Sequence, residues 1–270
     1  MILRIAVLAV VNWLFFPGAF AASPMIAKFS TVLGDFEVLL RPDAAPVSVA
    51  NFISYADEGR YDSTIFHRST TYNPANIQIV QGGGFALSGE TLSPVETHPP
   101  IVLEAVQPNL RGTIAMARTS EPDSATSQWY FNVTDNPALD GSYAVFGSII
   151  GSGGLSVLDA LGAVTVYNAS SALGSAFSEM PLLESSLEVE NLVLVQNVAV
   201  VPFSITKIEK VDEGVKIDWT ALSTNTPVRV ERTENLVSGN WEAVSTNNRT
   251  ATFTDANAPA SAAFYRVVTE

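Results

Sequence analysis

The sequence contains no cysteine among its 270 residues, which excludes disulfide bonds and zinc sites built on thiolates. It is also poor in basic residues, because 14 lysines and arginines stand against 27 aspartates and glutamates, a formal net charge of −13. Nucleic-acid binding needs a basic face, so this charge argues against it. Histidine is scarce as well, with only His67 and His98. We therefore expect neither a metal site nor a cofactor.

The sequence also lacks an apolar run long enough to span a membrane comfortably. At the N-terminus, Arg4 precedes a mostly apolar run over residues 5–16, and A-F-A at residues 19–21 offers a cleavage site between small residues. This pattern is typical of a secretory signal peptide. We expect residues 1–21 to be such a signal and the protein to be exported, periplasmic or extracellular. A short membrane anchor is the weaker alternative.

Hydrophobic periodicity predicts many short strands and few helices. One helix should begin at Pro46, which suits a first helical position, and should end before Gly59; a second is expected over residues 155–161. Segments rich in small and polar residues predict surface loops over 88–100 and 168–186. Strands are expected over residues 25–33, 35–40, 112–117, 128–133, 144–149 and 192–201.

The pattern changes near residue 202, so we expect a main domain over residues 24–201 and a small β-sandwich over 202–270. The second part resembles a trimmed fibronectin type III module, on the evidence of its strand spacing and of Trp219 and Tyr265. It shows no catalytic motif. Its six strands are expected over residues 205–211, 215–219, 228–232, 241–245, 250–254 and 264–268.

Two stretches of the main domain, residues 64–85 and 111–133, place a few polar side chains among apolar ones. The polar groups are an arginine, a histidine and two glutamines. A hydrolase of the Ser-His-Asp kind needs a histidine base oriented by a third group, and no motif supplies one. This equipment suits holding a peptide better than cutting one. The four residues are His67, Arg68, Gln81 and Gln128.

At these stretches the chain resembles the cyclophilins, a family of peptidyl-prolyl cis-trans isomerases that bind cyclosporin. Five motifs follow in the family's order and at close to its spacing. The resemblance implies a mainly β fold, a closed eight-stranded antiparallel barrel with two capping helices. The motifs are F-H-R at 66–68, Q-G-G-G-F at 81–85, R-G-T-I-A-M-A-R at 111–118, D-S-A-T-S-Q at 123–128 and Y-A-V-F-G at 143–147.

The resemblance also implies roles for individual residues. Arg68 and Gln81 would be catalytic, with Arg68 donating to the prolyl nitrogen through a guanidinium that stays charged at any working pH. Arg68 in a structural ion pair, the glutamines as ordinary strand residues and the pocket walls as core residues remain alternatives. Residues expected to bind a proline-containing polypeptide are His67, Ile79, Ala117, Gln128, Tyr130, Leu139 and Tyr143.

The sequence departs from the family pattern beside the expected pocket. Gln78 stands where an aromatic residue is expected, and the loop after Arg68, which contains Tyr72, is longer than in the family's common form. Ala138 stands where many members carry a tryptophan linked to cyclosporin binding, so weak cyclosporin binding is expected. The function implied is isomerisation of X-Pro bonds in unfolded or flexible exported proteins. The alternative is a module that binds proline-containing segments without turnover.

Overall fold

The computed structural model describes residues 25–70, 76–222, 227–236, 240–259 and 263–269. The expected signal peptide lies outside these residues, as does Tyr72. Contacts divide the chain into two compact units, one formed by residues 25–149 and 153–201 and the other mainly by 202–270. Within the described residues, no helix has the length and apolar character needed to cross a membrane.

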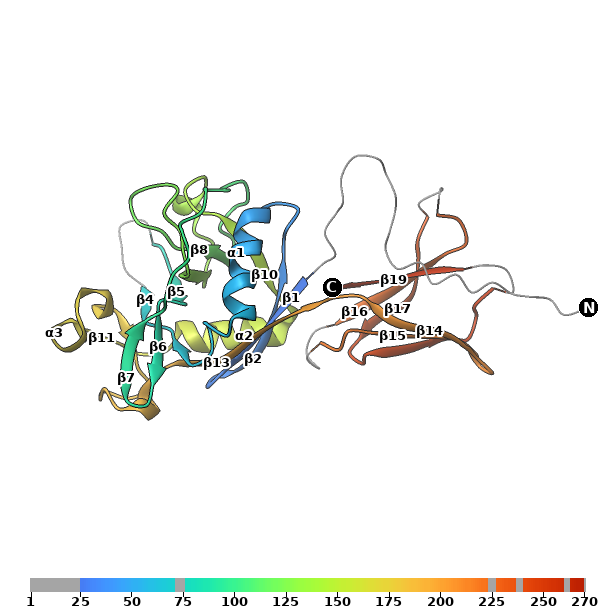
Figure 1. Cartoon of the computed structure of the whole chain (residues 1–270). Helices are drawn as coiled ribbons and strands as arrows, with labels where there is room; N and C mark the ends of the chain where they lie inside the picture. Colours follow the sequence, from blue (N-terminus) through green and yellow to red (C-terminus); the bar gives the residue numbers. More distant parts are fainter. Residues whose placement is uncertain (1–24, 71–75, 223–226, 237–239, 260–262, 270) are drawn as a thin grey trace, which may run out of the picture. The chain divides into compact units, whose positions relative to one another are not determined.

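The first unit is built on one 11-stranded sheet in the order β4-β5-β9-β8-β10-β2-β1-β13-β3-β6-β7 (Figure 1). Its strands are short, in agreement with the pattern of the sequence. They are β1 (Met25–Thr31), β2 (Gly34–Leu40), β3 (Thr64–Ile65), β4 (Arg68–Thr70), β5 (Ile79–Gly82), β6 (Phe85–Ser88), β7 (Thr91–Pro94), β8 (Thr113–Met116), β9 (Trp129–Asn132), β10 (Val145–Ile150) and β13 (Leu194–Pro202).

This sheet curls but does not form the closed eight-stranded barrel that we expected. Residues 64–70, the segment that could close the sheet into a barrel, pair with two different strands. The backbone N–H of Phe66 donates to Val193 O at 2.9 Å, whereas the N–H of His67 donates to Gln81 O at 3.0 Å. β3 therefore pairs toward β13, while β4 pairs with β5. The fold is mainly β, as expected, but its sheet is open.

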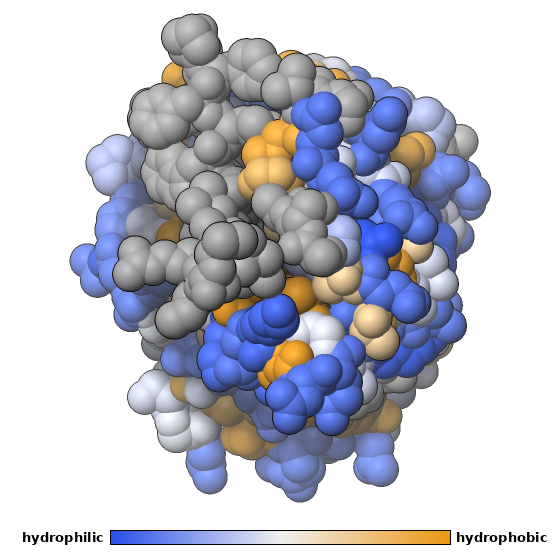
Figure 2. Space-filling view, turned by 90° about the vertical axis from the view of Figure 1, so that its right-hand side faces the viewer, coloured by the Kyte–Doolittle hydropathy of each residue, from blue (hydrophilic) through white to orange (hydrophobic). Residues whose placement is uncertain are grey.

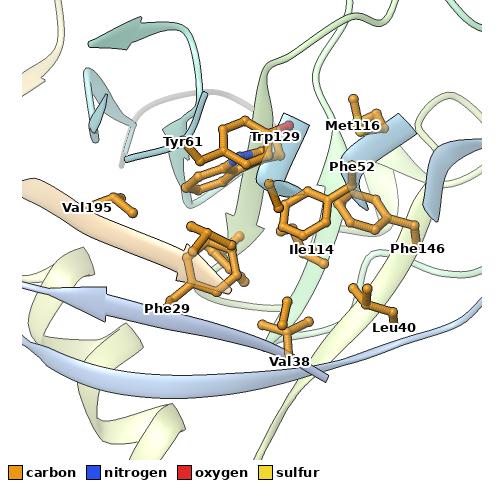
Figure 3. Close-up of a cluster of buried hydrophobic side chains, with 14 of the residues drawn as sticks. Phe29, Val38, Leu40, Phe52, Tyr61, Ile114, Met116, Trp129, Phe146 and Val195 are labelled. Carbon is orange, nitrogen blue, oxygen red and sulfur yellow. The ribbon is translucent and has the colours of Figure 1, made fainter. Parts of the chain in front are cut away.

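An aromatic cluster fills the concave side of the sheet (Figure 3). The Phe29 ring stacks on Phe36 with ring centroids 5.0 Å apart, and it meets the edges of Trp129 at 5.3 Å and Phe131 at 5.4 Å. Burying each of these side chains stabilises the fold by roughly 1.5–3 kcal/mol. Because successive side chains of a strand point to opposite faces, Trp129 and Phe131 in the core direct Tyr130 to the other face of β9.

Two helices of about three turns pack against the same core. Helix α1 (Pro46–Asp57) begins at Pro46, and Gly59 follows its end with φ +68°, so both predicted boundaries are confirmed. Helix α2 (Gly151–Gly162) is longer than predicted, since it includes the glycine-rich segment 151–154. Glycine has low helix propensity, which conceals this first turn in the sequence. Its close packing explains the glycine at 154, where a Cβ would lie 2.6 Å from Ile149.

Both predicted surface loops contain ordered elements. Within residues 88–100, β7 forms a hairpin with β6. Within residues 168–186, strand β12 (Met180–Pro181) pairs with β11 (Val166–Tyr167), and the side chains of Phe177 and Met180 are buried. The expectation of simple loops is wrong because non-local pairing organises these polar stretches. This segment also contains α3 (Ser170–Leu173) and η2 (Ser175–Phe177). Two further short helices of the unit lie outside it, η1 (Pro137–Leu139) and η3 (Val189–Asn191).

The second unit contains two three-stranded sheets, β14-β15-β18 and β17-β16-β19. Both contribute buried apolar side chains, among them Trp219 from β15 and Val230 from β16. The face shown in Figure 2 is mainly hydrophilic outside the residues drawn in grey. All six predicted strands are present, with shifted ends. They are β14 (Ile205–Val211), β15 (Gly214–Trp219), β16 (Val228–Thr233), β17 (Glu242–Asn248), β18 (Thr252–Asp255) and β19 (Phe264–Thr269).

Candidate active site

The candidate site is built on a row of residues that crosses four neighbouring strands. Arg68 on β4 is opposite Gln81 on β5, Gln81 is opposite Tyr130 on β9, and Tyr130 is opposite Ala115 on β8. Cross-strand neighbours of this kind lie side by side on one face of a sheet. Because successive side chains of a strand point to opposite faces, Val80, which precedes Gln81 on β5, lies in the main core. The sheet thus gathers residues from distant parts of the sequence on the face opposite the core.

A pocket of about 270 Å³ lies on this face. Its floor is an apolar cluster in which Ile79, Ala115, Tyr130 and Val145 are buried, and Arg68 stands at its border. Most of the residues predicted for the site line it. The lining residues are Arg68, Thr70, Ile77, Ile79, Gln81, Ala117, Arg118, Tyr130, Leu139 and Tyr143.

Arg68 is held at the pocket by a residue of β5 and by a turn residue just before β12. Its Nε donates to Glu179 Oε2 at 2.8 Å, and a terminal nitrogen lies 3.5 Å from Gln81 Oε1, at the outer limit of a hydrogen bond. The predicted alternative of an ion pair is therefore also present in the structure. The pair engages Nε, which leaves the terminal nitrogens on the side of Gln81 and the pocket.

The two glutamines are linked directly. Gln81 Nε2 donates to Gln128 Oε1 at 2.7 Å. Gln128 does not line the pocket itself but lies immediately before β9, against Gly84. A Cβ added to Gly84 would come within 2.8 Å of the Gln128 side chain, and one added to Gly82 within 2.6 Å of Trp129. The glycine run of the Q-G-G-G-F motif thus provides space for Gln128 and the core tryptophan.

The hydroxyl of Tyr130, which a phenylalanine would lack, has a hydrogen-bond partner. The hydroxyl donates to Asn109 Oδ1 at 2.8 Å, and this bond is buried. Burial, and then the neighbouring Tyr143, raise the pKa of Tyr130 above its ordinary value, so the hydroxyl stays neutral. Asp140 accepts the Asn109 backbone N–H at 2.7 Å, which fixes the segment behind the pocket. The polar network satisfies the hydroxyl while the ring remains an apolar wall.

Arg118, to which the sequence assigned no role, also lines the pocket. Its guanidinium carbon lies 4.7 Å from the ring centroid of Tyr143, a cation–π contact, and its Nε donates to Ser142 O at 2.7 Å. Tyr143 in turn meets Tyr130 edge to face with ring centroids 5.6 Å apart. Arg118 therefore supports one side of the pocket by stacking on the aromatic wall.

His67 lies elsewhere than the pocket. Its side chain is buried, and its ring meets Phe85 edge to face with centroids 5.0 Å apart. Burial, and then the positive charge of Arg68, lower the pKa of His67 to about 4. The imidazole is therefore neutral near pH 7 and is poorly suited to donate a proton. Its position supports a packing role behind Arg68.

Four residues of the site were missed in the sequence. Thr70, Ile77 and Arg118 line the pocket, and Glu179 binds Arg68. Thr70 lies two residues after Arg68 on β4, so strand alternation could have indicated it. Ile77 lies two residues before Ile79, ahead of β5. Glu179 carries no local signal, because it is 111 residues from Arg68. In the described part of the chain, no group of three or more acidic, histidine or cysteine side chains is arranged to hold a metal ion.

Comparison with known proteins gives one family. Residues 26–175 match the model of the family described as "Cyclophilin type peptidyl-prolyl cis-trans isomerase/CLD". The chain is 43% identical to peptidyl-prolyl cis-trans isomerase A of Dickeya dadantii over 60% of this chain and 85% of that protein. It is 43% identical to a peptidyl-prolyl cis-trans isomerase of Acinetobacter baylyi over 52% of this chain and 73% of that protein.

Solved structures give weaker matches. One is the crystal structure of a cyclophilin-type isomerase of Cryptosporidium parvum, at 20% sequence identity and a TM-score of 0.48. The match covers 66% of this chain and 98% of that chain.

Proposed function

The chain belongs to the cyclophilin-type family of peptidyl-prolyl cis-trans isomerases, and on this premise we propose that the pocket beside Arg68 is where it rotates X-Pro bonds. Peptide rotation has a barrier of about 18–20 kcal/mol because the C–N bond has partial double-bond character. Uncatalysed X-Pro exchange takes roughly tens to hundreds of seconds. A catalyst needs only to bind the twisted amide better than either planar form.

The observation that carries this proposal is that Arg68 lines the same pocket as a group of apolar side chains. The pocket walls Ile79, Tyr130 and Leu139 suit a proline ring. When the amide twists, the prolyl nitrogen regains a lone pair, and the Arg68 guanidinium is a charged donor that lines the same pocket as these walls. A fixed donor aimed at charge that develops in the transition state is the most effective kind of catalytic group.

The linked glutamines suit the substrate backbone. Gln81 lines the pocket, and Gln128 is bound to it. In this proposal they orient the residues on either side of proline, so that Arg68 meets the nitrogen rather than a carbonyl group. His67 takes no part in proton transfer and supports the strand from behind.

The decisive experiment measures cis-trans exchange of a short Ala-Pro peptide by NMR. Arg68→Ala should lower the exchange rate by about 10²–10³-fold, the usual loss for one preorganised donor. Arg111→Ala is the matched control, because it also removes an arginine paired with a carboxylate, Asp159, outside the pocket. Peptide binding by the folded wild type without catalysed exchange would favour the alternative function, a non-catalytic binding module.

The departures from the family pattern lead to a second proposal, that cyclosporin binds weakly. Ala138 lies exposed on η1, beside the pocket residue Leu139. A small side chain there offers little apolar surface to a large ligand. A nanomolar inhibition constant for cyclosporin would contradict this proposal.

We also propose that the protein is exported and that its second unit is a fibronectin type III-like module. The pattern of residues 1–21 supports the first proposal, and the two three-stranded sheets support the second. Substrates would then be unfolded or flexible exported chains. Mass spectrometry of the protein from the cell exterior or periplasm tests export: an N-terminus near residue 22 is expected, and one at Met1 would contradict signal cleavage.

A further inference from the structure

Glu179 binds β4 at three points. Its Oε2 accepts from Arg68 Nε at 2.8 Å, and its Oε1 accepts from Thr70 Oγ1 at 3.1 Å. Its backbone oxygen accepts from the N–H of Ser69 at 2.8 Å. Both carboxylate oxygens are therefore engaged by alternate residues on one face of the same strand. The carboxylate therefore binds two alternate residues of β4 at once and is not held by Arg68 alone.

The segment that carries Glu179 is anchored on both sides. Phe177 before it and Met180 after it are buried, at 3% and 0% exposure. Met180 also pairs with Tyr167 in the β11–β12 ladder, and the Phe177 backbone oxygen accepts from the N–H of Ala169 at 2.9 Å. The carboxylate is thus presented from a fixed backbone, which a flexible loop would not provide.

We propose that Glu179 is a positioning residue that orients the Arg68 guanidinium for isomerisation, an inference that rests on the function proposed above. Arginine loses rotamer entropy when its side chain is fixed. Glu179 fixes it before the substrate binds, by holding Nε. The terminal nitrogens then remain directed toward Gln81 and the pocket, where the prolyl nitrogen would lie. Prior fixing of a catalytic group lowers the barrier of the reaction.

The same geometry defines an opposite outcome that the test must distinguish from positioning. A carboxylate so close to the guanidinium could restrain it, in which case removing Glu179 would speed the reaction. The hydrogen-bond pattern favours positioning, since Glu179 binds Nε while a terminal nitrogen faces Gln81, and the pair is partly open to solvent, with the Arg68 side chain 41% exposed. An ion pair this exposed adds little to stability. The effect of Glu179 should therefore be seen in the rate more than in the melting temperature.

The test compares four single variants with the wild type. Glu179→Ala removes the acceptor, Glu179→Gln keeps an oxygen acceptor but removes the charge, and Thr70→Val removes the second hydrogen bond to the carboxylate. Glu184→Ala is the matched control, because this exposed glutamate lies in the same segment, away from the pocket. For each, kcat and KM are measured on an Ala-Pro peptide, with the melting temperature and the NMR signal of the Arg68 Nε–H.

If Glu179 positions Arg68, Glu179→Ala lowers kcat by about tenfold with little change in KM and shifts the Arg68 Nε–H signal. Glu179→Gln recovers most of the rate, Thr70→Val falls about twofold, and Glu184→Ala matches the wild type. A wild-type or raised kcat in Glu179→Ala, with the Nε–H signal shifted, would overturn the inference while leaving the proposed function intact. An inactive wild type would overturn both.

Discussion

The side-chain amide of Gln81 donates a 2.7 Å hydrogen bond to the amide oxygen of Gln128. This bond uses the nitrogen of Gln81 and turns its oxygen toward Arg68, whose terminal nitrogen lies 3.5 Å away. Arg68, Gln81 and Gln128 thus form a chain of donors and acceptors along the edge of the pocket. Such a chain fixes the orientation of each amide, which the sequence alone leaves open.

A double-mutant cycle should detect this coupling. We expect Gln81→Ala and Gln128→Ala each to lower kcat/KM by about tenfold, the factor that corresponds to about 1.4 kcal/mol. The double variant should lose less than the product of the two, because either change already breaks the shared bond. Gln196→Ala, at an exposed position of β13, is the control. Fully multiplicative losses would show that the two amides act independently.

Replacing Tyr130 with phenylalanine should separate stability from activity. Tyr130→Phe keeps the pocket wall but leaves the buried Asn109 oxygen without this donor, so we expect a loss of about 1 kcal/mol in the free energy of unfolding. Asn132 Nδ2, 3.3 Å from the same oxygen, limits the cost. The peptide exchange rate should stay close to that of the wild type, because the ring that lines the pocket is kept. A large fall in rate with unchanged stability would assign the hydroxyl a direct role.

His67 should make the fold less stable in acid. Its pKa is about 4 in the folded protein, below the ordinary 6.5 that it regains on unfolding. Between these values the unfolded chain binds the proton and the native chain does not, so stability falls as the pH falls from 6.5 to 4. The full difference is roughly 3 kcal/mol. At pH 7 both states are neutral and the cost is absent.

Urea unfolding at several pH values checks this prediction. His67→Gln should flatten the dependence of the unfolding free energy on pH between pH 4 and 6.5. In the wild type and in this variant, kcat/KM is also measured as a function of pH. Replacing His67 should not change the dependence of kcat/KM on pH near 6.5. If His67→Gln left the pH dependence of the unfolding free energy unchanged, the pKa of His67 would be the same in the folded and unfolded chain, and the prediction would be wrong.

The sequence contained enough to locate most of the pocket. Arg68, Gln81 and Tyr130 lie in short alternating strands, and period-two alternation dictates that they face away from core residues such as Val80 and Phe131. The family motifs then indicated which face carries the chemistry. Local pattern was sufficient here because each of these residues is oriented by its own strand.

The remaining features depend on contacts that no local pattern encodes. Glu179 reaches Arg68 only because the β11–β12 ladder folds a polar segment back onto β4. The pairing of residues 64–70 with β13 at one end and β5 at the other likewise depends on distant strands, so the sequence did not indicate that the sheet is open. A run of small polar residues looks like a loop whether or not it pairs with a remote strand.

The glycine at position 84 offers a way to disturb the site from a neighbouring backbone position. A Cβ there would lie 2.8–3.0 Å from three atoms of the Gln128 side chain, and no backbone atom is among these nearest neighbours. Because a flexible side chain can move aside at low cost, Gly84→Ala should leave the fold intact but displace Gln128 and break its bond to Gln81. We expect kcat/KM to fall by about tenfold, as for Gln128→Ala.

The distinguishing measurement is the same substitution in a chain that already lacks the glutamine side chain. In the Gln128→Ala background, Gly84→Ala should have no further effect on kcat/KM, since the group it displaces is gone. Gly82→Ala serves as the contrast: its Cβ would meet the buried ring of Trp129 at 2.6 Å, so it should lower the melting temperature in both backgrounds. If Gly84→Ala lowered the rate equally with and without Gln128, the glycine would be required by the backbone or the substrate, and the link between the Q-G-G-G-F motif and Gln128 would be wrong.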